Sequence, residues 1–323
     1  KVNLFCARMS YSCAPYVIAY WRQNLESFLD AIIHTLNYFG GVPRSMIFDN
    51  ARVAVKSGFG AHAAAQDDYS KLAAHYGFQP VFCNPASGNE KGLVENLVGY
   101  IRRNVCVPLP QVDSLEDLNT KLLEQCAKYM NHKIDGRSQK VGQMLAEDQA
   151  HLHPLPKYVL DISKKAYPKV NRYSTVLFDT NYYSVPCKYR GKGTTVKAYP
   201  NRVEIWINGL LVATHDRCMG RKQESLDLRH YLPILERKGR AIRYARPVLN
   251  AVPAEFLNWM EKQHLNSKQM VELLEQCLTD GYLAVMQRDL PNPDTSIAKN
   301  DVPVLSVDLS QYDKLYERKG AAS

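Results

Sequence analysis

The sequence predicts an α/β fold, in which a mixed sheet flanked by helices is followed by a small antiparallel β-barrel and C-terminal helices. Short hydrophobic strands alternate with amphipathic helices through residues 1–135, which is the pattern of an α/β layer. The periodicity changes to that of strands in residues 169–235 and then returns to helical spacing. At 323 residues, the chain is long enough for two or three folded units.

The first part of the chain alternates strands with helices. In the helix before Gly40, hydrophobic residues recur every three or four positions, and the glycine ends the helix. The strand that follows is a short hydrophobic run that ends at the carboxylate of Asp49. The expected elements are strands at 1–9, 16–21, 45–49 and 79–85 and helices at 25–39 and 67–77.

A helix over 89–104 presents Glu95 on a face that two glycines keep clear. Hydrophobic residues form the opposite face, and Gly92, Gly99 and Arg102 share the face of Glu95 at helical spacing. A further helix begins at its N-cap Ser114 and carries a hydrophobic stripe at Leu115, Leu118, Leu122, Cys126 and Tyr129.

The remainder of the chain divides into segments of different composition. Prolines and histidines around one short helix indicate an interdomain connection. In the alternating segment, Thr180-Asn181 and Asn208-Gly209 indicate hairpin turns, the second with the strong type I′ signal. The predicted organisation is a core at 1–135, a linker with a short helix at 136–168, a small β-barrel at 169–235, a basic segment with C-terminal helices at 236–290 and an extended tail at 291–323.

Charge and cysteine usage limit the function classes. Lys and Arg outnumber Asp and Glu by 41 to 32, which gives a net charge of +9 and favours a polyanionic partner such as nucleic acid or an acidic membrane surface. The eight cysteines have no spacing of a zinc site and suit free thiols in a reducing cytoplasm. No hydrophobic run approaches the roughly 20 residues that a membrane span requires.

Asp49 and Glu95 are the candidate catalytic and metal-binding residues. One ends a strand and the other lies on a helix after the next strand, so both can meet at the carboxyl edge of one sheet. Convergent carboxylates bind Mg²⁺, and two ions can hold the attacking and leaving oxygens of a phosphoryl displacement. The alternative is that Asp49 starts a turn and that Glu95 is a solvated helical carboxylate.

The stretches "GGVPRSMIFDNARVAV" and "HYGFQPVFCNPASGNEKGLVENLVGYIRRNV" resemble the catalytic core of DDE transposases and retroviral integrases. Within that family, they are most similar to bacterial insertion-sequence transposases of the IstA type. The resemblance continues in "NYYSVPCKYRGKGTTVKAYPNRVEIW", which is similar to the small barrel that follows the core in these transposases. It implies an RNase H-like integrase core with an Asp, Asp, Glu triad.

By position, the resemblance makes Asp49 the second acidic residue of the triad and Glu95 the third. Glu90 competes with Glu95 but lacks the "GxxE" context. The chain departs from the pattern at the first acidic residue, because no aspartate precedes Asp30, which falls in a predicted helix. We expect the first strand and its aspartate upstream of Lys1, and we expect the chain as it stands to be inactive.

Three groups of basic residues are candidates for DNA binding. One follows Glu95 on its helix, one lies in the predicted barrel with tyrosines interleaved, and one is the segment "RKGRAIRYAR". A solvated helix end, ordinary barrel filling by the tyrosines and a solvated linker are the respective alternatives. The candidates are Arg102, Arg103, Lys188, Arg190, Lys192, Arg237, Lys238, Arg240 and Arg243.

The resemblance implies a DNA transposase that uses Mg²⁺, with Mn²⁺ as an alternative, for 3′-end processing and strand transfer of an insertion sequence. Its expected partners are transposon-end and target DNA, a helper ATPase of the AAA+ class and further copies of itself, as a dimer or tetramer on DNA. The expected location is the bacterial cytoplasm, at the nucleoid. An RNase H-like nuclease without joining activity and a non-catalytic DNA-binding scaffold are the alternatives.

Overall fold

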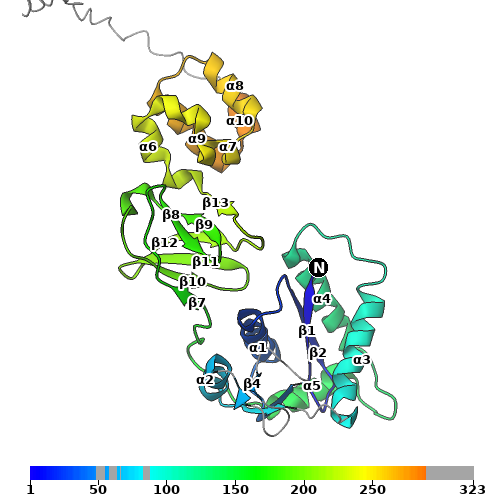
Figure 1. The fold of residues 1–323 in the computed structure, drawn as a ribbon. Helices are drawn as coiled ribbons and strands as arrows, with labels where there is room; N and C mark the ends of the chain where they lie inside the picture. The colour runs from blue at the N-terminus through cyan, green and yellow to red at the C-terminus, as the bar shows by residue number, and fades with distance from the viewer. Residues whose placement is uncertain (49–54, 58–63, 66, 83–87, 289–323) are drawn as a thin grey trace, which may run out of the picture. The chain divides into compact units, whose positions relative to one another are not determined.

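The structure is a computed structural model that describes residues 1–48, 55–57, 64–65, 67–82 and 88–288. The chain divides into two compact units, Lys1–His230 and Tyr231–Ser323, and each is described by itself. The first unit contains the mixed α/β part and a small β-rich part, and the second consists of short helices (Figure 1). The predicted mixed α/β character is confirmed. The extended tail predicted at 291–323 lies outside the described residues.

A hairpin forms the middle of the α/β part. Strands β1 (Asn3–Arg8) and β2 (Pro15–Tyr20) pair antiparallel, close to the two strands that the sequence predicts. Both faces of β2 are buried. Val17 and Ala19 pack against helices α3 (Gly88–Asn104) and α4 (Leu115–Tyr129), while Tyr16 packs on the other face with Phe39 of α1 (Leu25–Phe39). The hairpin therefore lies between two layers of helices (Figure 1).

Helix α1 (Leu25–Phe39) has capping residues at both ends. The side chain of Asn24 accepts a hydrogen bond from the Ser27 amide at 3.0 Å, and Gly40 closes the helix in the left-handed conformation with φ 77°. The Phe28 ring lies 5.9 Å from the ring of Phe5 in β1 and 5.5 Å from that of Phe48 in β3. One helix thus packs against both the hairpin and the next pair of strands.

That next pair is parallel. Strand β3 (Ser45–Phe48) pairs with β6 (Gln79–Phe82) in register from Ser45–Gln79 to Phe48–Phe82. Helix α2 (Asp67–Tyr76) lies between them in the chain, and two short strands, β4 (Val55–Ser57) and β5 (Ala64–Ala65), pair with each other. The carboxyl ends of β3 and β6 therefore meet at one edge.

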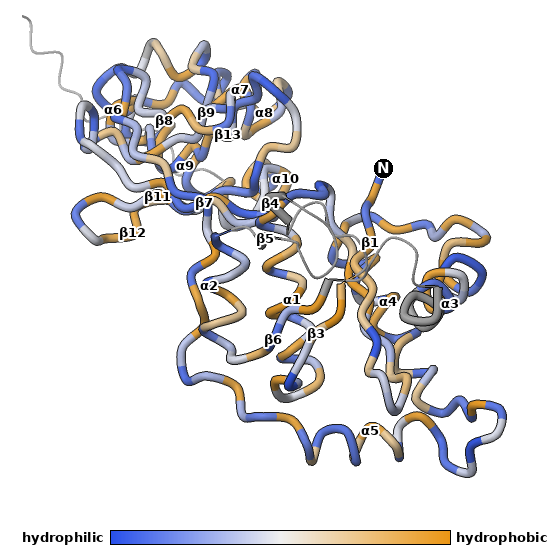
Figure 2. Tube along the Cα trace, turned by 60° about the horizontal axis from the view of Figure 1, so that its bottom comes forward, coloured by the Kyte–Doolittle hydropathy of each residue, from blue (hydrophilic) through white to orange (hydrophobic). Residues whose placement is uncertain are grey.

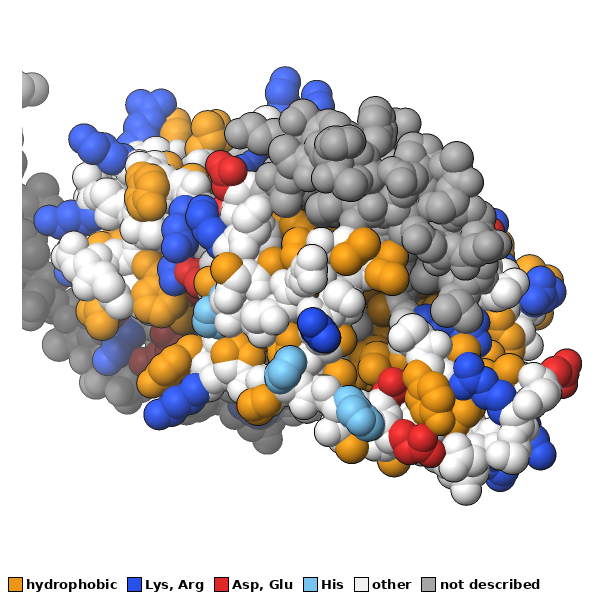
Figure 3. Space-filling view, turned by 90° about the horizontal axis from the view of Figure 1, so that it is seen from below, with side chains coloured by type: hydrophobic (Ala, Val, Ile, Leu, Met, Phe, Trp, Pro, Cys, Tyr) orange, Lys and Arg blue, Asp and Glu red, His pale blue; other side chains and the backbone are white. Residues whose placement is uncertain are grey.

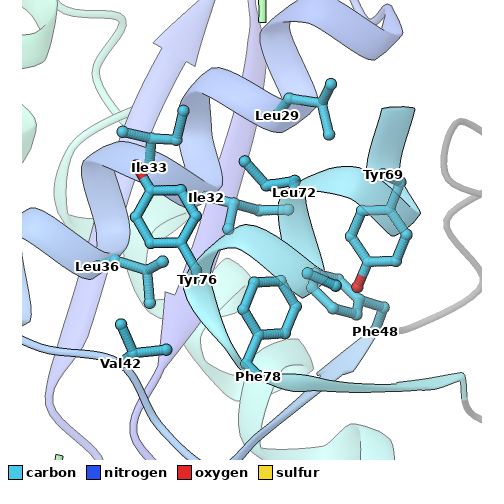
Figure 4. Packing of buried hydrophobic residues seen from close by; sticks show 11 residues of the cluster. Leu29, Ile32, Ile33, Leu36, Val42, Phe48, Tyr69, Leu72, Tyr76 and Phe78 are labelled. Atoms are coloured by element: carbon cyan, nitrogen blue, oxygen red, sulfur yellow. The ribbon is translucent and has the colours of Figure 1, made fainter. Parts of the chain in front are cut away.

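The core of this region lies between α1, α2 and the parallel pair (Figure 2). Side chains from α1, α2 and β3, and that of Phe78 just before β6, point into it (Figure 4), and Phe48 and Tyr69 meet edge-on at a centroid distance of 5.4 Å. The predicted hydrophobic spacing of the first helix is confirmed by its buried face. The buried residues are Leu29, Ile32, Ile33, Leu36, Val42, Phe48, Tyr69, Leu72, Ala73, Tyr76 and Phe78.

Helices α3 (Gly88–Asn104) and α4 (Leu115–Tyr129) cover the other face of the hairpin. Ser114 caps α4 as predicted, and Leu122 and Cys126 of its stripe are fully buried. Asn119 of α4 also reaches the outer edge of β2: its Oδ1 accepts from the Ala19 amide at 2.7 Å, and its Nδ2 donates to the Ala19 carbonyl at 3.3 Å. One side chain thereby takes the place of a neighbouring strand.

The predicted linker at 136–168 is packed on both sides. Helix α5 (Val141–Ala150) buries Val141 and Met144 in a cluster with Phe39 of α1. Strand β7 (Lys164–Ala166) pairs with β10 and so belongs to the β-rich part. The Asp161 carboxylate forms an ion pair with the ammonium group of Lys197 in β10, with an N–O distance of 3.0 Å.

The β-rich part consists of two small sheets around one core. One sheet has the order β12-β11-β10-β7 and the other β13-β9-β8. The closed antiparallel barrel that the sequence predicts is not confirmed, because the described strands divide between these sheets and β13 pairs with β9 in parallel. The strands are β8 (Thr175–Phe178), β9 (Asn181–Ser184), β10 (Thr195–Ala198), β11 (Arg202–Ile207), β12 (Leu210–Asp216) and β13 (Glu224–Ser225).

The two hairpin turns differ in how well the sequence predicted them. Asn208 and Gly209 have φ 50° and 77°, as expected for a type I′ turn. The first turn lies one residue earlier than predicted, with its positive φ values at Asp179 (48°) and Thr180 (67°). Arg22 forms an ion pair with Asp179 at 2.9 Å, a tertiary contact that helps to hold this turn.

A buried histidine pair joins β9 to the end of the first unit. The hydroxyl of Ser184 lies 2.8 Å from Nδ1 of His230, and the Ser184 carbonyl lies 2.7 Å from Nε2 of His215. Burial lowers the pKa of both imidazoles, that of His230 to about 4. Both rings are therefore neutral at physiological pH.

We expect the β-rich part to lose stability between about pH 6.5 and pH 4. Over this range the unfolded chain binds protons that the buried His230 excludes, so the stability present above pH 6.5 is lost as the pH falls. Urea unfolding followed by the fluorescence of Trp206 measures this effect. In His230→Gln the loss over this range should shrink, and an unchanged pH dependence would contradict the assignment.

The second unit is a group of short helices around Phe256, Met260 and Leu274. Helices are present in the C-terminal segment, as the sequence predicts, and Gly281 with φ 82° separates α9 (Ser267–Asp280) from α10 (Tyr282–Met286). No helix in the described ranges is long and apolar enough to cross a membrane. The elements are α6 (Leu232–Arg237), a 3-10 segment (Gly239–Tyr244), α7 (Arg246–Ala251), α8 (Ala254–Lys262), α9 (Ser267–Asp280) and α10 (Tyr282–Met286).

Candidate active site and nucleic-acid surface

The candidate active site lies at the carboxyl edge of the parallel pair. Asp49 follows Phe48, the last residue of β3, and helix α3 follows the neighbouring strand β6 after residues 83–87. Asp49 itself lies outside the described residues. The strand predicted before it is present, but the expected burial holds at Phe48 alone, because Phe48 is 8% exposed whereas Ile47 is 55% exposed.

Glu95 is exposed on α3, and its helix explains why. Leu97 and Ile101, each 1% exposed, turn one side of α3 into the core against β2, which leaves the side of Glu95 toward solvent. Within the described residues, its carboxylate has no hydrogen-bond or ion-pair partner.

The two arginines that follow Glu95 have different surroundings. Both Arg102 and Arg103 are exposed. The guanidinium of Arg103 lies back over Gly99, because a Cβ added to that glycine would be 3.4 Å from one of its terminal nitrogens. Arg102, by contrast, lies near enough to Cys6 of β1 to favour its thiolate, although burial is the larger effect and raises the pKa of Cys6 to about 12. Gly99 therefore gives Arg103 room on the side of the helix that the sequence assigned to Glu95.

The chemistry of these donors fits a hard cation. Mg²⁺ prefers carboxylate oxygens, and Glu95 offers an exposed carboxylate without a competing partner in the described part of the chain. Among the described residues, which do not include Asp49, no three or more His, Cys, Asp or Glu side chains come together as a metal site. Glu95 is therefore a candidate ligand for such an ion.

The basic candidates of the β-rich part lie on its surface. Lys188, Arg190 and Lys192 are all exposed, and the Lys188 ammonium lies 5.1 Å from the centre of the Tyr189 ring. Tyr183, which the sequence grouped with these residues, is fully buried in the core. The strand alternation places it inward, so its role is packing.

Sequence reasoning missed two further cations at the same surface, Lys169 and Arg172, which are also exposed. The backbone pairing of Lys169 with Gly193 brings the segment that contains Lys169 and Arg172 beside the one that contains Lys188, Arg190 and Lys192. The local sequence had no signal for this pairing, because the two segments are separated by a complete hairpin.

The predicted basic segment of the second unit is folded. Arg237 and Lys238 are exposed at the end of α6, whereas Arg243 forms an ion pair with Glu261 of α8. The side chain of Arg240 lies outside the described residues. On the face of the molecule in Figure 3, basic side chains lie mostly toward the edges.

Comparisons with known proteins place these features in a family context. Residues 155–227 match the family model described as Mu transposase, C-terminal domain. A transposase from Aminobacter aminovorans is 32% identical over 88% of this chain and 58% of its own length. A transposase for insertion sequences IS1326/IS1353 from Pseudomonas aeruginosa is 30% identical over the same shares, and one for IS21 from that organism is 29% identical over 72% of this chain and 60% of its own length.

The chain thus spans about 58% of the length of the first of these relatives. Among solved structures, a chain of a simian T-cell lymphotropic virus intasome in complex with PP2A regulatory subunit B56 gamma aligns with a TM-score of 0.35 and 14% identity. The alignment covers 68% of this chain and 74% of that chain.

Proposed function

Because this chain is a homologue of insertion-sequence transposases, we propose that its residues 1–135 form most of a DDE-type catalytic core. The observation that carries the proposal is the exposed carboxylate of Glu95 on α3, which has no hydrogen-bond or ion-pair partner among the described residues. That helix follows β6, which is parallel to the strand that leads into Asp49. This is the arrangement in which two distant carboxylates can serve one site.

In the proposed reaction, Asp49 and Glu95 hold Mg²⁺, or Mn²⁺ as an alternative, and the metal supplies Lewis-acid activation of water and then of a DNA 3′-hydroxyl. The chain's own residues position the DNA: Arg103, beside Gly99 on α3, and Arg102 neutralise phosphates next to the site. The proposed products are processed transposon 3′ ends and their joining to target DNA.

We also propose that the two strand pairs belong to one RNase H-like sheet. Phe5 of β1 and Phe48 of β3 pack on the same Phe28 of α1, so one helix covers both pairs. A strand from before Lys1, with the first aspartate of the triad, would complete this sheet and its active site. In this proposal the chain is a part of a longer transposase and is inactive without the remainder.

The partners are proposed on the same basis. The net charge of +9 suits transposon-end and target DNA, and joining two DNA ends to a target favours a dimer or tetramer. The exposed Lys188, Arg190 and Lys192, together with Arg237 and Lys238, extend the DNA contact beyond the active site. A helper ATPase of the AAA+ class and a location at the bacterial nucleoid complete the proposal.

Strand transfer by the full-length parent protein tests this function. With Mg²⁺, preprocessed transposon ends and a target plasmid, we expect the parent to join DNA and its Asp49→Asn variant to lose joining while it still binds DNA, because the amide is a poor ligand for the metal. Cutting without joining by the parent would favour the nuclease alternative. Joining by the variant at the parent's rate would refute the role of Asp49.

A further inference from the structure

Charged side chains join the α/β part to the β-rich part, both of which belong to the unit Lys1–His230. From the α/β part, Arg22 precedes α1 and Glu26 lies in its first turn. From the β-rich part, Asp179 lies in the turn between β8 and β9, and Arg217 follows β12. We call these four residues the junction cluster.

The ion pairs of the junction cluster run between the two parts. Nη1 of Arg22 lies 2.9 Å from Oδ2 of Asp179, and Nη2 of Arg22 donates to the Met219 carbonyl at 2.6 Å. Nη2 of Arg217 lies 3.8 Å from Oε1 of Glu26 and 3.7 Å from Oδ2 of Asp179. Each part therefore supplies one positive and one negative side chain, and the charges of the cluster balance.

Arg217 is buried, but its carboxylate neighbours are not close. Its side chain is 3% exposed. Nη1 donates to the Tyr199 carbonyl at 3.0 Å, whereas Nε has no hydrogen-bond partner among the described residues. The distances to the two carboxylates exceed those of a hydrogen bond. Because a buried charge is costly unless close partners surround it, this guanidinium depends on both carboxylates.

The two parts have separate hydrophobic cores. The cluster of the β-rich part takes its members from residues 166–218, whereas the clusters of the α/β part take theirs from residues 2–162. Among the described residues, no side chain belongs to clusters of both parts. Polar contacts between separately folded parts permit relative motion. The β-rich part can therefore leave the α/β part without opening either core.

We propose that the junction cluster is a releasable latch. It holds the β-rich part at the start of α1, and its release lets the β-rich part change position while both parts stay folded. Because the partners of the buried Arg217 are distant, loss of the Glu26 charge is enough to open the latch. This inference does not depend on the proposed reaction, since it concerns a contact within the chain.

The test compares Glu26→Gln with Glu116→Gln in the 323-residue chain. Both substitutions remove a carboxylate from the first turn of a helix, so both lose the same kind of interaction with a helix dipole. Glu116 is exposed on α4 and lies outside the junction cluster. The two variants therefore differ in whether the lost charge faces Arg217.

A double variant isolates the buried charge as the cause. Glu26→Gln leaves Arg217 with Asp179, a carboxylate that it shares with Arg22. Adding Arg217→Met removes the surplus positive charge and keeps an unbranched side chain near the Phe178 ring, whose centre lies 5.8 Å from Cζ of Arg217. We expect Glu26→Gln/Arg217→Met to close again, because a buried charge without enough partners costs more than a hydrophobic side chain.

Hydrogen exchange followed by mass spectrometry measures the contact and the two parts separately. In Glu26→Gln, we expect exchange in peptides from residues 20–27 and 217–220 to rise on the order of tenfold. Strands β10 and β11 and the middle of α1 should keep the protection of the parent. Glu116→Gln and the double variant should match the parent in all of these peptides.

Exchange at the parent's rate in the contact peptides of Glu26→Gln would overturn the proposal, since the contact would then not depend on the balance of charge. Faster exchange throughout both parts would also overturn it, because the cluster would then support folding and not a releasable contact. A double variant that is looser than Glu26→Gln would refute the role of the buried charge. Strand transfer is not measured here, so its failure would count only against the proposed reaction.

Discussion

Glu95→Gln in the full-length parent protein is expected to reduce strand transfer by about a thousandfold or more, since it removes a proposed metal ligand whose contribution is several kcal/mol. The substitution keeps the size of the side chain and its exposed position on α3. Binding of transposon-end DNA should change by less than about threefold, because the phosphate contacts of Arg102 and Arg103 are retained.

The matched control is Glu90→Gln on the same helix. Glu90 lies five positions earlier and lacks the "GxxE" context, so its variant should join DNA at nearly the rate of the parent. If Glu90→Gln lost joining and Glu95→Gln retained it, the two assignments would be exchanged. Joining by both variants would reject this helix as the source of a metal ligand.

Asn119→Ala is expected to destabilise the α/β part by about 2–4 kcal/mol, because it removes two hydrogen bonds and leaves a buried amide and carbonyl without partners. Both groups belong to Ala19, which is 0% exposed. Hydrogen exchange gives a local reading of this effect. In the variant, the Ala19 amide should exchange much faster than in the parent, whereas the other amides of β2 should change less.

Asn104→Ala provides the comparison for this variant. Asn104 is also on a helix, but it is exposed and its side chain donates to the Tyr100 carbonyl at 2.8 Å, so its loss should cost less than about 0.5 kcal/mol. Equal effects of the two substitutions on the midpoint of chemical unfolding would show that the contact with Ala19 contributes little.

Local patterns predicted the elements of the first unit well. The spacing of hydrophobic residues placed α1 and α4, and Gly40 and Ser114 marked a helix end and a helix start that the structure confirms. The Asn208-Gly209 turn was equally clear, since both residues readily adopt positive φ. In each case the determinant lies within a few residues of the element.

Tertiary contacts decided what the sequence could not show. The turn at Asp179 contains no glycine and is held partly by an ion pair with the distant Arg22. The three residues of β7 have no hydrophobic alternation, and their pairing with β10 makes them a strand. The catalytic roles of Asp49 and Glu95 stay a prediction, because Asp49 lies outside the described residues and the structure shows only that Glu95 is exposed.

The contact between Asn119 and Ala19 also has a consequence for synthesis on the ribosome. Strands β1 and β2 lie within the first 20 residues, but the side chain that covers the edge of β2 is made 100 residues later. At translation rates of about 5–20 residues per second, the nascent hairpin waits about 5–20 s with an open edge. Open edges invite pairing with other chains, so we expect co-translational protection of this hairpin to matter until Asn119 has been made.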